Sequence, residues 1–321
     1  MQGRPNIAIA ASVVNCRWCK EHDITTKGHP LAWNYVDPRW LPDDIDKAMK
    51  MQFDRIGRCV RRFEGGIDIW DVVNEATHYD RAQCLAQAPK LTDGIKKMGV
   101  GAYLRKAFES ARKASPDATL IINDYRTDQA YVNKVIKELI DDKDKPMFDV
   151  IGIQSHMHGG YWGAKKAWDV CEKYAKFNVP LNFTETTVVS GPKSNKGWNT
   201  TTDGEKSQAR DAAQFYTVLF SHPAVEAITW WDFTDQGAWQ GAPAGFLRKD
   251  MTPKPMYHTL KGLIKGKWWT TTEVKTAKGG AAGFRGFYGQ YKVSVRSKGQ
   301  MLSGTFEFDK NTKGKVRVQL R

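Results

Sequence analysis

Short apolar runs alternate with longer helix-like segments over the first 265 residues, and each apolar run ends in polar residues. Strands that are apolar along their whole length and separated by helices are typical of a parallel sheet buried on both faces. This pattern predicts six parallel strands, at residues 25–33, 67–74, 119–124, 150–156, 181–185 and 227–232. It predicts helices at residues 43–63, 102–113, 130–140, 164–177 and 207–221.

The alternation predicts an α/β fold of the (β/α) barrel type, in which active sites form at the C-terminal ends of the strands. An eight-stranded barrel needs two more strands, and only residues 1–24 precede the first predicted one. They hold one apolar stretch, residues 7–14, followed by a helix-like stretch. The barrel is therefore expected to be shortened at its N-terminal side.

The last residues of the chain have a different character, being rich in Gly, Thr and Lys. Period-2 alternation between Gly and Asn turns predicts a small antiparallel β module. The alternating runs are residues 284–287, 290–295, 305–308 and 316–320. We therefore expect two domains, a barrel at residues 1–265 and a β module at residues 266–321. The aromatic residues Phe287, Tyr288 and Tyr291 suit either internal packing or a sugar platform, and packing is the favoured interpretation.

Composition narrows the functional classes. The chain has 321 residues with 12 Trp and 11 Tyr, several of them beside Asp, Asn or Gln, a combination that suits the apolar faces and hydroxyl edges of sugars. The net charge is +14, but scattered lysines without a nucleic-acid-binding motif favour a solvated basic surface over a nucleic-acid partner. No apolar run approaches the ~18 residues of a membrane span.

The sequence offers little for a metal site or a leader segment. Cys16 and Cys19 form a single C-x-x-C pair within a helix-like stretch, so packing is the better interpretation, and no metal or organic cofactor is expected. The first residues lack the basic and apolar pattern of a signal peptide.

Two glutamates end two of the predicted strands, Glu75 after residues 67–74 and Glu185 at the end of residues 181–185. Retaining hydrolysis of a glycosidic bond needs two carboxyl groups ~5–5.5 Å apart, one as nucleophile and one as acid and then base. A single glutamate in such a place could equally cap a helix or pair with a surface lysine. Two of them, one preceded by Asn74, favour catalysis.

Several strand ends resemble the xylanases of glycoside hydrolase family 10, a (β/α)8 barrel family. The matching segments are GHPLAW (28–33), WDVVNEA (70–76), NDY (123–125), IGIQSHMH (151–158), FTE (183–185) and ITWWDFTDQGAW (228–239). The resemblance covers residues 11–265 in family order. It implies a TIM-type barrel lacking its first two strands, a catalytic domain that cleaves β-1,4-linked xylan and xylo-oligosaccharides, and secretion, as expected for such a substrate.

The resemblance also implies roles for individual residues. Glu75 would be the acid/base, Glu185 the nucleophile, and Asn74 a donor to the sugar 2-hydroxyl. Gln154 and His156 would line the site near the nucleophile, with His156 orienting Glu185. Sugar contacts are implied for His29, Trp33, Trp231, Trp239 and Tyr125. Strand alternation requires Trp230 and Trp231 to face opposite ways, and the resemblance implies that Trp231 lies inside the barrel and Trp230 outside.

The chain departs from the family pattern in three places. Thr187 stands where an Asp is usual, so the hydrogen bonds around His156 and Glu185 are expected to differ, and Arg126 replaces an Asn after Tyr125. The first two strands, which bring sugar-binding side chains, are not recognisable. Three explanations are open: the chain is part of a longer product, which we favour; residues 7–14 patch a shortened barrel; or two chains cover each other's open edges as a dimer.

Three functions remain in competition. The first is a retaining endo-xylanase, with activity reduced by the missing strands. The second is a truncated xylan-binding protein with weak or no catalysis. The third is a β-glucanase of a related barrel family, because Asn-Glu at a strand end also fits the barrels of cellulases and mannanases. Activity on cellulose or mannan but not on xylan would favour the third.

Overall fold

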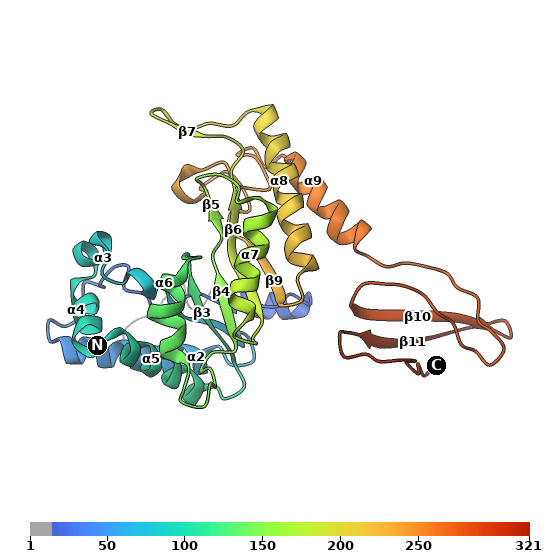
Figure 1. Ribbon diagram of the computed structural model, residues 1–321, viewed down its shortest axis with the longest axis horizontal. Coiled ribbons are helices and arrows are strands. Elements are labelled where there is room, and N and C mark those ends of the chain that lie inside the picture. Colours follow the sequence, from blue (N-terminus) through green and yellow to red (C-terminus); the bar gives the residue numbers. More distant parts are fainter. Residues whose placement is uncertain (1–14) are drawn as a thin grey trace.

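The computed structural model describes residues 15–321. Its centre is a curved parallel sheet in the order β1-β2-β3-β4-β6-β9, with the short strand β5 also pairing with β6 (Figure 1). The six predicted strands are thereby confirmed. The strands are β1 (Lys27–Gly28), β2 (Ile69–Asn74), β3 (Thr119–Asp124), β4 (Val150–Ile153), β5 (His156–Met157), β6 (Leu181–Val188) and β9 (Val225–Trp230).

Helices connect the strands and cover the outer face of the sheet (Figure 1). The α-helices are α2 (Ile45–Arg62), α3 (Ala82–Gln87), α4 (Pro89–Met98), α5 (Val100–Ala114), α6 (Gln129–Tyr131), α7 (Gly163–Ala175), α8 (Thr202–Ser221) and α9 (Pro255–Gly262). The predicted helix at 130–140 is instead α6 followed by a π-helical turn, Val132–Ile136, and a 3₁₀ turn, Lys137–Leu139. Other short elements are the 3₁₀ turns Ala76–His78 and Trp239–Gly241, the π-helical turn Leu263–Lys267, and the hairpin β7 (Lys193–Ser194) and β8 (Gly197–Trp198).

Strand β1 is shorter than the predicted run 25–33, and proline explains the difference. Pro30 has no backbone N–H to give to a ladder, so regular pairing ends before it. The chain rejoins the sheet at Ala32, which bridges to Val73. Gly28 is required here, because a Cβ at this position would lie 2.1 Å from the ring of Trp70.

The predicted strand 150–156 is also divided, into β4 and β5. Ser155 between them has a left-handed backbone with φ of 55°, and its hydroxyl bonds to Thr186 Oγ1 at 2.7 Å. Non-glycine residues adopt this conformation rarely, and such positions concentrate at functional sites. The turn sends the side chains of Gln154 and His156 from the strand end toward neighbouring strands.

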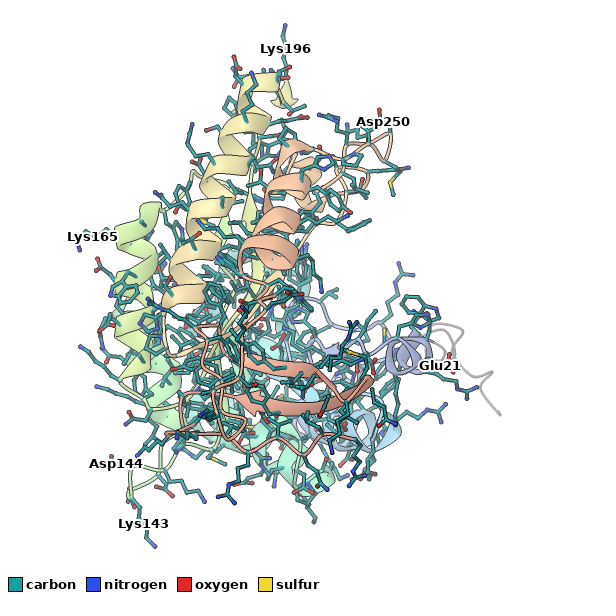
Figure 2. All side chains as sticks on the ribbon, turned by 90° about the vertical axis from the view of Figure 1, so that its right-hand side faces the viewer. Glu21, Lys143, Asp144, Lys165, Lys196 and Asp250 are labelled. Carbon is teal, nitrogen blue, oxygen red and sulfur yellow. The ribbon has the colours of Figure 1, made fainter. Side chains whose placement is uncertain are left out.

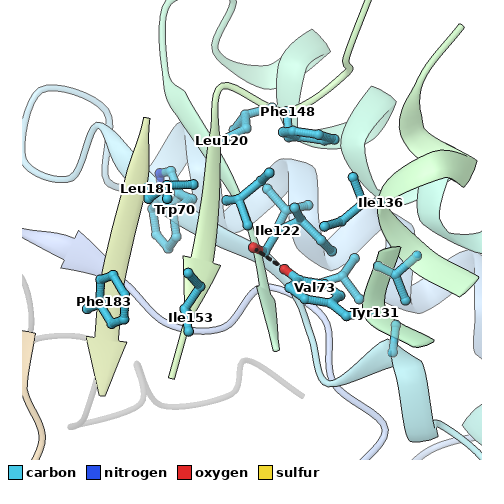
Figure 3. Packing of buried hydrophobic residues seen from close by; sticks show 14 of the residues in the cluster. Trp70, Val73, Leu120, Ile122, Tyr131, Ile136, Phe148, Ile153, Leu181 and Phe183 are labelled. Carbon is cyan, nitrogen blue, oxygen red and sulfur yellow. Dashed lines mark hydrogen bonds between the residues drawn. The ribbon is translucent and has the colours of Figure 1, made fainter. Parts of the chain in front are cut away.

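The hydrophobic core lies between the sheet and the helices that cover it (Figure 3). Ile122, Ile153 and Phe183 from three adjacent strands are fully buried there. Tyr131 is also fully buried, and its hydroxyl donates to the carbonyls of Ile122 and Gly152 at 2.8 and 3.2 Å. Since a buried phenol needs a partner, this bond anchors α6 to the sheet.

The sheet does not close within the described residues. Strands β1 and β9 each pair there with one neighbour only, so the described part of the chain supplies six of the eight strands that the resemblance implies. The stretch 7–14, one proposed patch for this gap, lies outside the described residues. On β9 the side chain of Glu226 and that of Thr229 are exposed, whereas β6 is buried throughout.

The C-terminal β module is a two-stranded antiparallel hairpin, β10 (Gly289–Ser297) and β11 (Gln300–Phe308). It lies to one side of the barrel beyond α8 and α9, at the end of an extended segment (Figure 1). The prediction of strands at 284–287 and 316–320 is wrong. The first segment turns back onto β10, where Tyr291 donates to the carbonyl of Phe287. The second crosses β11 at Gly304 and exchanges backbone bonds only through Arg321 and Ser303.

Three further findings concern membrane spans, cysteines and metal ligands. Among residues 15–321, no helix combines the length and the apolar character needed to cross a membrane. All five cysteines are free, and Cys16 is buried as the packing interpretation expects. The described residues contain no group of three His, Cys, Asp or Glu side chains placed to hold a metal ion.

Candidate active site

Glu75 follows the last residue of β2 and has a left-handed backbone, with φ of 57°. Its N–H donates to the carbonyl of Asn123 at 3.0 Å, which ties this strained residue to the end of β3. Backbone strain in a non-glycine residue persists only where the surroundings fix it. The side chain is 12% exposed, although its Oε2 atom is itself buried.

Glu185 lies on β6 and is more deeply buried, with 5% of its side chain exposed. One oxygen accepts from Asn123 Nδ2 at 2.8 Å, and the other lies 3.0 Å from His156 Nε2. His29 Nδ1 is 3.9 Å from the first oxygen. Two donors therefore compensate the burial of this carboxylate, which would otherwise be costly.

Three side-chain amides join the two carboxylates. Asn123 Nδ2, which donates to Glu185, also donates to Asn74 Oδ1 at 2.8 Å. Gln154 Nε2 donates to the same Asn74 oxygen at 3.2 Å and to Glu75 Oε1 at 3.1 Å. The orientation of the Asn123 amide is fixed because Thr184 donates to its oxygen at 2.7 Å. The strand ends of β2, β3, β4 and β6 thus hold both glutamates in one network.

The network adds one detail to the sequence interpretation. Gln154 was expected near Glu185, and its carbonyl does accept from the Glu185 N–H at 3.1 Å. Its side chain, however, bonds to Glu75. Asn123, which was quoted only as part of a matching segment, is the residue that contacts Glu185 directly.

Glu75 also has a cationic neighbour that the sequence analysis missed. Arg81 Nη1 lies 2.5 Å from Glu75 Oε2, an ion pair whose angles do not meet those of a hydrogen bond. The guanidinium carbon is 6.0 Å from the ring centroid of Tyr125. The Tyr125 hydroxyl bonds to His78 Nδ1, and burial raises the pKa of this tyrosine. Tyr125 therefore stands beside the Arg81–Glu75 pair, at the end of β3.

His29 and a buried carboxylate fix the opposite side of the site. Asp71 on β2 is fully buried, and one of its oxygens lies 2.8 Å from His29 Nδ1 and 2.6 Å from Lys27 Nζ. The ring of Trp33 packs at a tilt against Tyr35, with centroids 4.3 Å apart. Within the described residues, no recorded contact joins Trp33 to either glutamate, so its predicted contact with sugar stays a prediction.

Aromatic rings line the site on the side of β9. Trp231 lies edge-on to His29 and His156, with centroids 5.9 and 5.7 Å away. Trp239 packs against His156 at 4.6 Å and against His158 at 4.9 Å. Both tryptophans keep about two fifths of their surface exposed. Trp230 points the other way, toward Tyr216 and Phe246, as the alternation predicted.

Thr187 occupies the position where the resemblance leads one to expect an aspartate. Its hydroxyl lies 3.4 Å from His156 Nδ1 and accepts from the Met157 N–H at 3.2 Å. A neutral hydroxyl therefore contacts the ring nitrogen opposite Glu185. The difference from the family's network around His156 stays a prediction.

Two buried groups near the site have displaced pKa values. Desolvation raises the pKa of Asp124 to about 6, although the N–H groups of Thr77 and Arg126 donate to it. Burial, aided by His156 and Lys193, lowers the pKa of His158 to about 4. The Nε2 atom of His158 is buried without a hydrogen-bond partner in the described part of the chain, which suits a neutral ring.

The His158 shift predicts a loss of stability in mild acid. An unfolded histidine takes up a proton near pH 6.5, whereas this one stays neutral until about pH 4. The free energy of unfolding should therefore fall as the pH drops from 6.5 to 4, by about 1–2 kcal/mol after allowance for partial exposure. Urea unfolding at pH 7 and pH 5 measures this. His158→Gln should reduce the difference, and replacing the exposed His258 by Gln should not; equal effects of both would refute the assignment.

The family of this chain follows from its similarity to known proteins. The sequence model of the family described as "Glycosyl hydrolase family 10" matches residues 2–262. The chain belongs to glycosyl hydrolase family 10. Its fold is accordingly that of a TIM barrel, of which the described residues form the curved six-stranded part, with a small antiparallel hairpin added.

Two sequence relatives show how the chain sits among known proteins. Endo-1,4-beta-xylanase B of Thermotoga neapolitana is 28% identical over 265 residues, which cover 77% of this chain and 71% of that protein. Anti-sigma-I factor RsgI6 of Acetivibrio thermocellus is 25% identical over 287 residues, or 88% of this chain and 34% of that protein.

A solved xylanase structure is similar to this chain in both sequence and fold. Xylanase 10B of Thermotoga petrophila RKU-1, crystallised in complex with xylobiose, is 29% identical and superposes with a TM-score of 0.65. The match covers 83% of this chain and 81% of the other. This chain and the Thermotoga petrophila xylanase therefore agree in fold over most of their lengths.

Proposed function

We propose that this family 10 chain is an endo-1,4-β-xylanase that hydrolyses xylan with retention of anomeric configuration. The observation that carries the proposal is the amide network joining Glu75 and Glu185 across four adjacent strand ends. Two carboxyl groups held side by side at that end of a barrel are what double displacement requires. Because xylan lies outside cells, we also propose that the enzyme acts there.

The different surroundings of the two glutamates support different roles. Glu185 is buried and held by donors at both oxygens, which keeps it oriented as the nucleophile that attacks the anomeric carbon. Glu75 is more exposed and can meet both the leaving-group oxygen and the incoming water. In the first step Glu75 donates a proton as Glu185 forms the glycosyl ester. In the second step Glu75 takes a proton from water as the ester is hydrolysed.

The contacts of Glu75 suggest which oxygen holds the proton. Its Oε1 accepts from Gln154, whereas Oε2 has only the misaligned ion pair with Arg81. A proton on Oε1 would face the Gln154 donor and a proton on Oε2 would face the Arg81 guanidinium, so protonation at Oε2 requires Arg81 to move away. Arg81 would then move from Oε2 when the acid is protonated and return as the carboxylate forms.

The remaining side chains support substrate binding around the carboxylates. The Asn74 Nδ2 atom lies 3.5 Å from Glu75 Oε1, at the edge of hydrogen bonding, and is available to a sugar 2-hydroxyl. The exposed faces of Trp231 and Trp239 would stack on the sugar that Glu185 attacks. Tyr125 would stack on the sugar of the leaving group. His29 would approach the same sugar from β1.

A xylan-binding protein with weak catalysis is the second candidate. The sheet formed by the described residues does not close between β1 and β9, which favours this candidate, because subsites on further strands would add binding energy that helps orient the substrate. Such a protein would bind xylo-oligosaccharides but release little reducing sugar.

The test is to follow the protein on xylan, cellulose and mannan. The proposal predicts internal cleavage of xylan, seen as a rapid fall in polymer length, and initial products in the β-configuration by proton NMR. Products in the α-configuration would contradict the retaining mechanism. Cleavage of cellulose or mannan without cleavage of xylan would move the chain to a related specificity.

A further inference from the structure

Most of the net positive charge of this chain lies in its last 56 residues. Residues 266–321 contain 12 Lys and Arg but three Asp and Glu, a net charge of +9 out of the chain's +14. The preceding 265 residues contain 37 cations and 32 anions, which nearly balance. The lysines therefore look scattered only in the barrel, and the hairpin segment is strongly basic.

These cations have no anionic partners. Every ion pair found among the described residues joins positions between Lys27 and Lys254. Each of the 12 cations at residues 266–321 is exposed, and in the described part of the chain none lies within ion-pair distance of a carboxylate. Self-repulsion in such a segment is unfavourable unless an anionic partner neutralises it.

The two faces of the hairpin separate charge from aromatic packing. On one face Tyr291 stacks on Phe306, with centroids 5.2 Å apart, and Phe284 packs against both. The opposite face is exposed and carries Lys292 and Arg296 of β10. Cross-strand neighbours of these two cations are Thr305 and Met301, neither of them acidic.

Further exposed lysines lie at both ends of the hairpin. Lys298 lies in the turn between the strands, and Lys310 and Lys313 follow β11. We call Lys292, Arg296, Lys298, Lys310 and Lys313 the basic surface. The one acidic residue on the same face is Glu307, opposite Gln290.

We propose that the basic surface binds acidic polysaccharide and tethers the catalytic barrel to xylan chains that bear uronic acid groups. The charge complementarity is direct: several unpaired cations on an extended hairpin face match carboxylates spaced along a polymer. The choice of polymer rests on the proposed xylanase function.

Nucleic acid is the competing polyanion, and the arrangement of the aromatic rings disfavours it. Proteins that bind single strands interleave cations with aromatic platforms on which bases stack. Here Tyr291 and Phe306 are engaged with each other on the face opposite Lys292 and Arg296. The basic surface is therefore suited to contacts through charge alone, with strong dependence on salt.

The experiment compares binding of the full chain to an insoluble glucuronoxylan and to the same xylan after reduction of its carboxyl groups. The test variant replaces Lys292, Arg296, Lys298 and Lys310 by Gln. The matched control removes the same charge from exposed, unpaired barrel lysines, by Lys113, Lys137, Lys143 and Lys176 to Gln. Duplex and single-stranded DNA are measured in parallel.

We expect the native chain to bind the acidic xylan at least tenfold more tightly than the reduced one, and 0.5 M salt to abolish the difference. The test variant should lose this preference and the control should keep it. Equal binding to both xylans, equal losses in both variants, or tighter binding to DNA would overturn the inference.

Turnover of a soluble aryl β-xylobioside separates this inference from the proposed function. Such a neutral substrate reaches the barrel alone, so both variants should retain native turnover, which also shows that they fold. Native turnover without a preference for acidic xylan would refute the tether only. Absent turnover in the native chain would refute the xylanase proposal.

Discussion

Replacing Glu185 by Gln should lower kcat on xylan by on the order of 10⁴-fold or more, because the amide cannot form the glycosyl ester. The fold should survive. Glu185 accepts from Asn123 Nδ2 and faces His156 Nε2, and glutamine has nearly the same shape. The amide oxygen can accept from Asn123. Its NH₂ group can face His156 if the imidazole proton moves to Nδ1, beside the Thr187 hydroxyl.

Initial rates on xylan and far-UV circular dichroism measure the two halves of this prediction. The control is Glu109→Gln, which removes an exposed carboxylate from α5 and should leave kcat unchanged. A Glu185→Gln variant with more than a tenth of native activity would refute the role of the nucleophile.

Azide distinguishes the two glutamates if each is shortened to alanine. In Glu185→Ala, azide in the vacated space attacks the sugar directly and gives the α-azide. In Glu75→Ala, the ester on Glu185 still forms from a substrate with a good leaving group, and azide then gives the β-azide. The reverse pair of products would mean that the two roles are exchanged.

The second large effect concerns stability, at a buried ion pair near the same strand ends. Lys254, the residue before α9, is fully buried, and its Nζ lies 2.9 and 2.7 Å from the two oxygens of Asp235. It also donates to the carbonyl of Pro243 at 3.2 Å. Lys254→Met should reduce the free energy of unfolding by about 3–5 kcal/mol, because Asp235 keeps its buried charge without a cation.

Urea unfolding of three further variants tests this explanation. Lys165→Met removes an exposed i, i+4 partner of Asp169 on α7, where Lys165 points into solvent (Figure 2), and should cost less than about 1 kcal/mol. Asp235→Asn alone and the double variant Lys254→Met with Asp235→Asn complete a double-mutant cycle. The double variant should be more stable than Lys254→Met alone. If it is less stable by the sum of the single effects, the lost charge partner is not the cause.

The fold was largely predictable because its strands obey a simple rule. Runs such as residues 119–124 are apolar along their length, and β3 has those bounds. Prediction was poorer where one residue overrides the pattern. Pro30 shortens β1 by removing a donor, and the left-handed Ser155 divides β4 from β5.

The C-terminal segment shows a different limit. Alternation marks a face that can be buried, but it does not say which partner buries it. Residues 316–320 alternate as β11 does, yet they pack across it. The absence of a side chain at Gly304 allows this, because a Cβ there would lie 2.8 Å from a methyl group of Val318. The basic character of this segment could have been found by counting charges over 266–321 separately from the barrel.

The site was predictable where the chemistry lies at strand ends. Asn74, Gln154, His156 and the two glutamates lie together, as parallel strands of one sheet require. The residues that were missed come from other places. Arg81 precedes α3 in a loop without periodicity, and only the three-dimensional structure brings it to Glu75.

Asp71 was also missed, although it lies within a predicted strand and not in a loop. It lies inside an apolar strand, in the segment WDVVNEA, where a carboxylate is costly unless it is paired. That cost was a usable signal. In the structure Asp71 is paired with Lys27 on β1 and with His29 just after β1. Strand β1 therefore positions His29, and it also forms one edge of the described sheet.

Covalent trapping tests the central claim most directly. The reagent is a 2-deoxy-2-fluoro-xylobioside with a dinitrophenyl leaving group. Its fluorine destabilises both oxocarbenium-like transition states, and its good leaving group makes the first step faster than the second, so the glycosyl ester accumulates. The account predicts a mass increase of one fluoroxylobiosyl unit per chain, located by peptide mapping on Glu185 and absent from Glu185→Gln. A label on any other residue, or turnover of xylan with inversion, would contradict it.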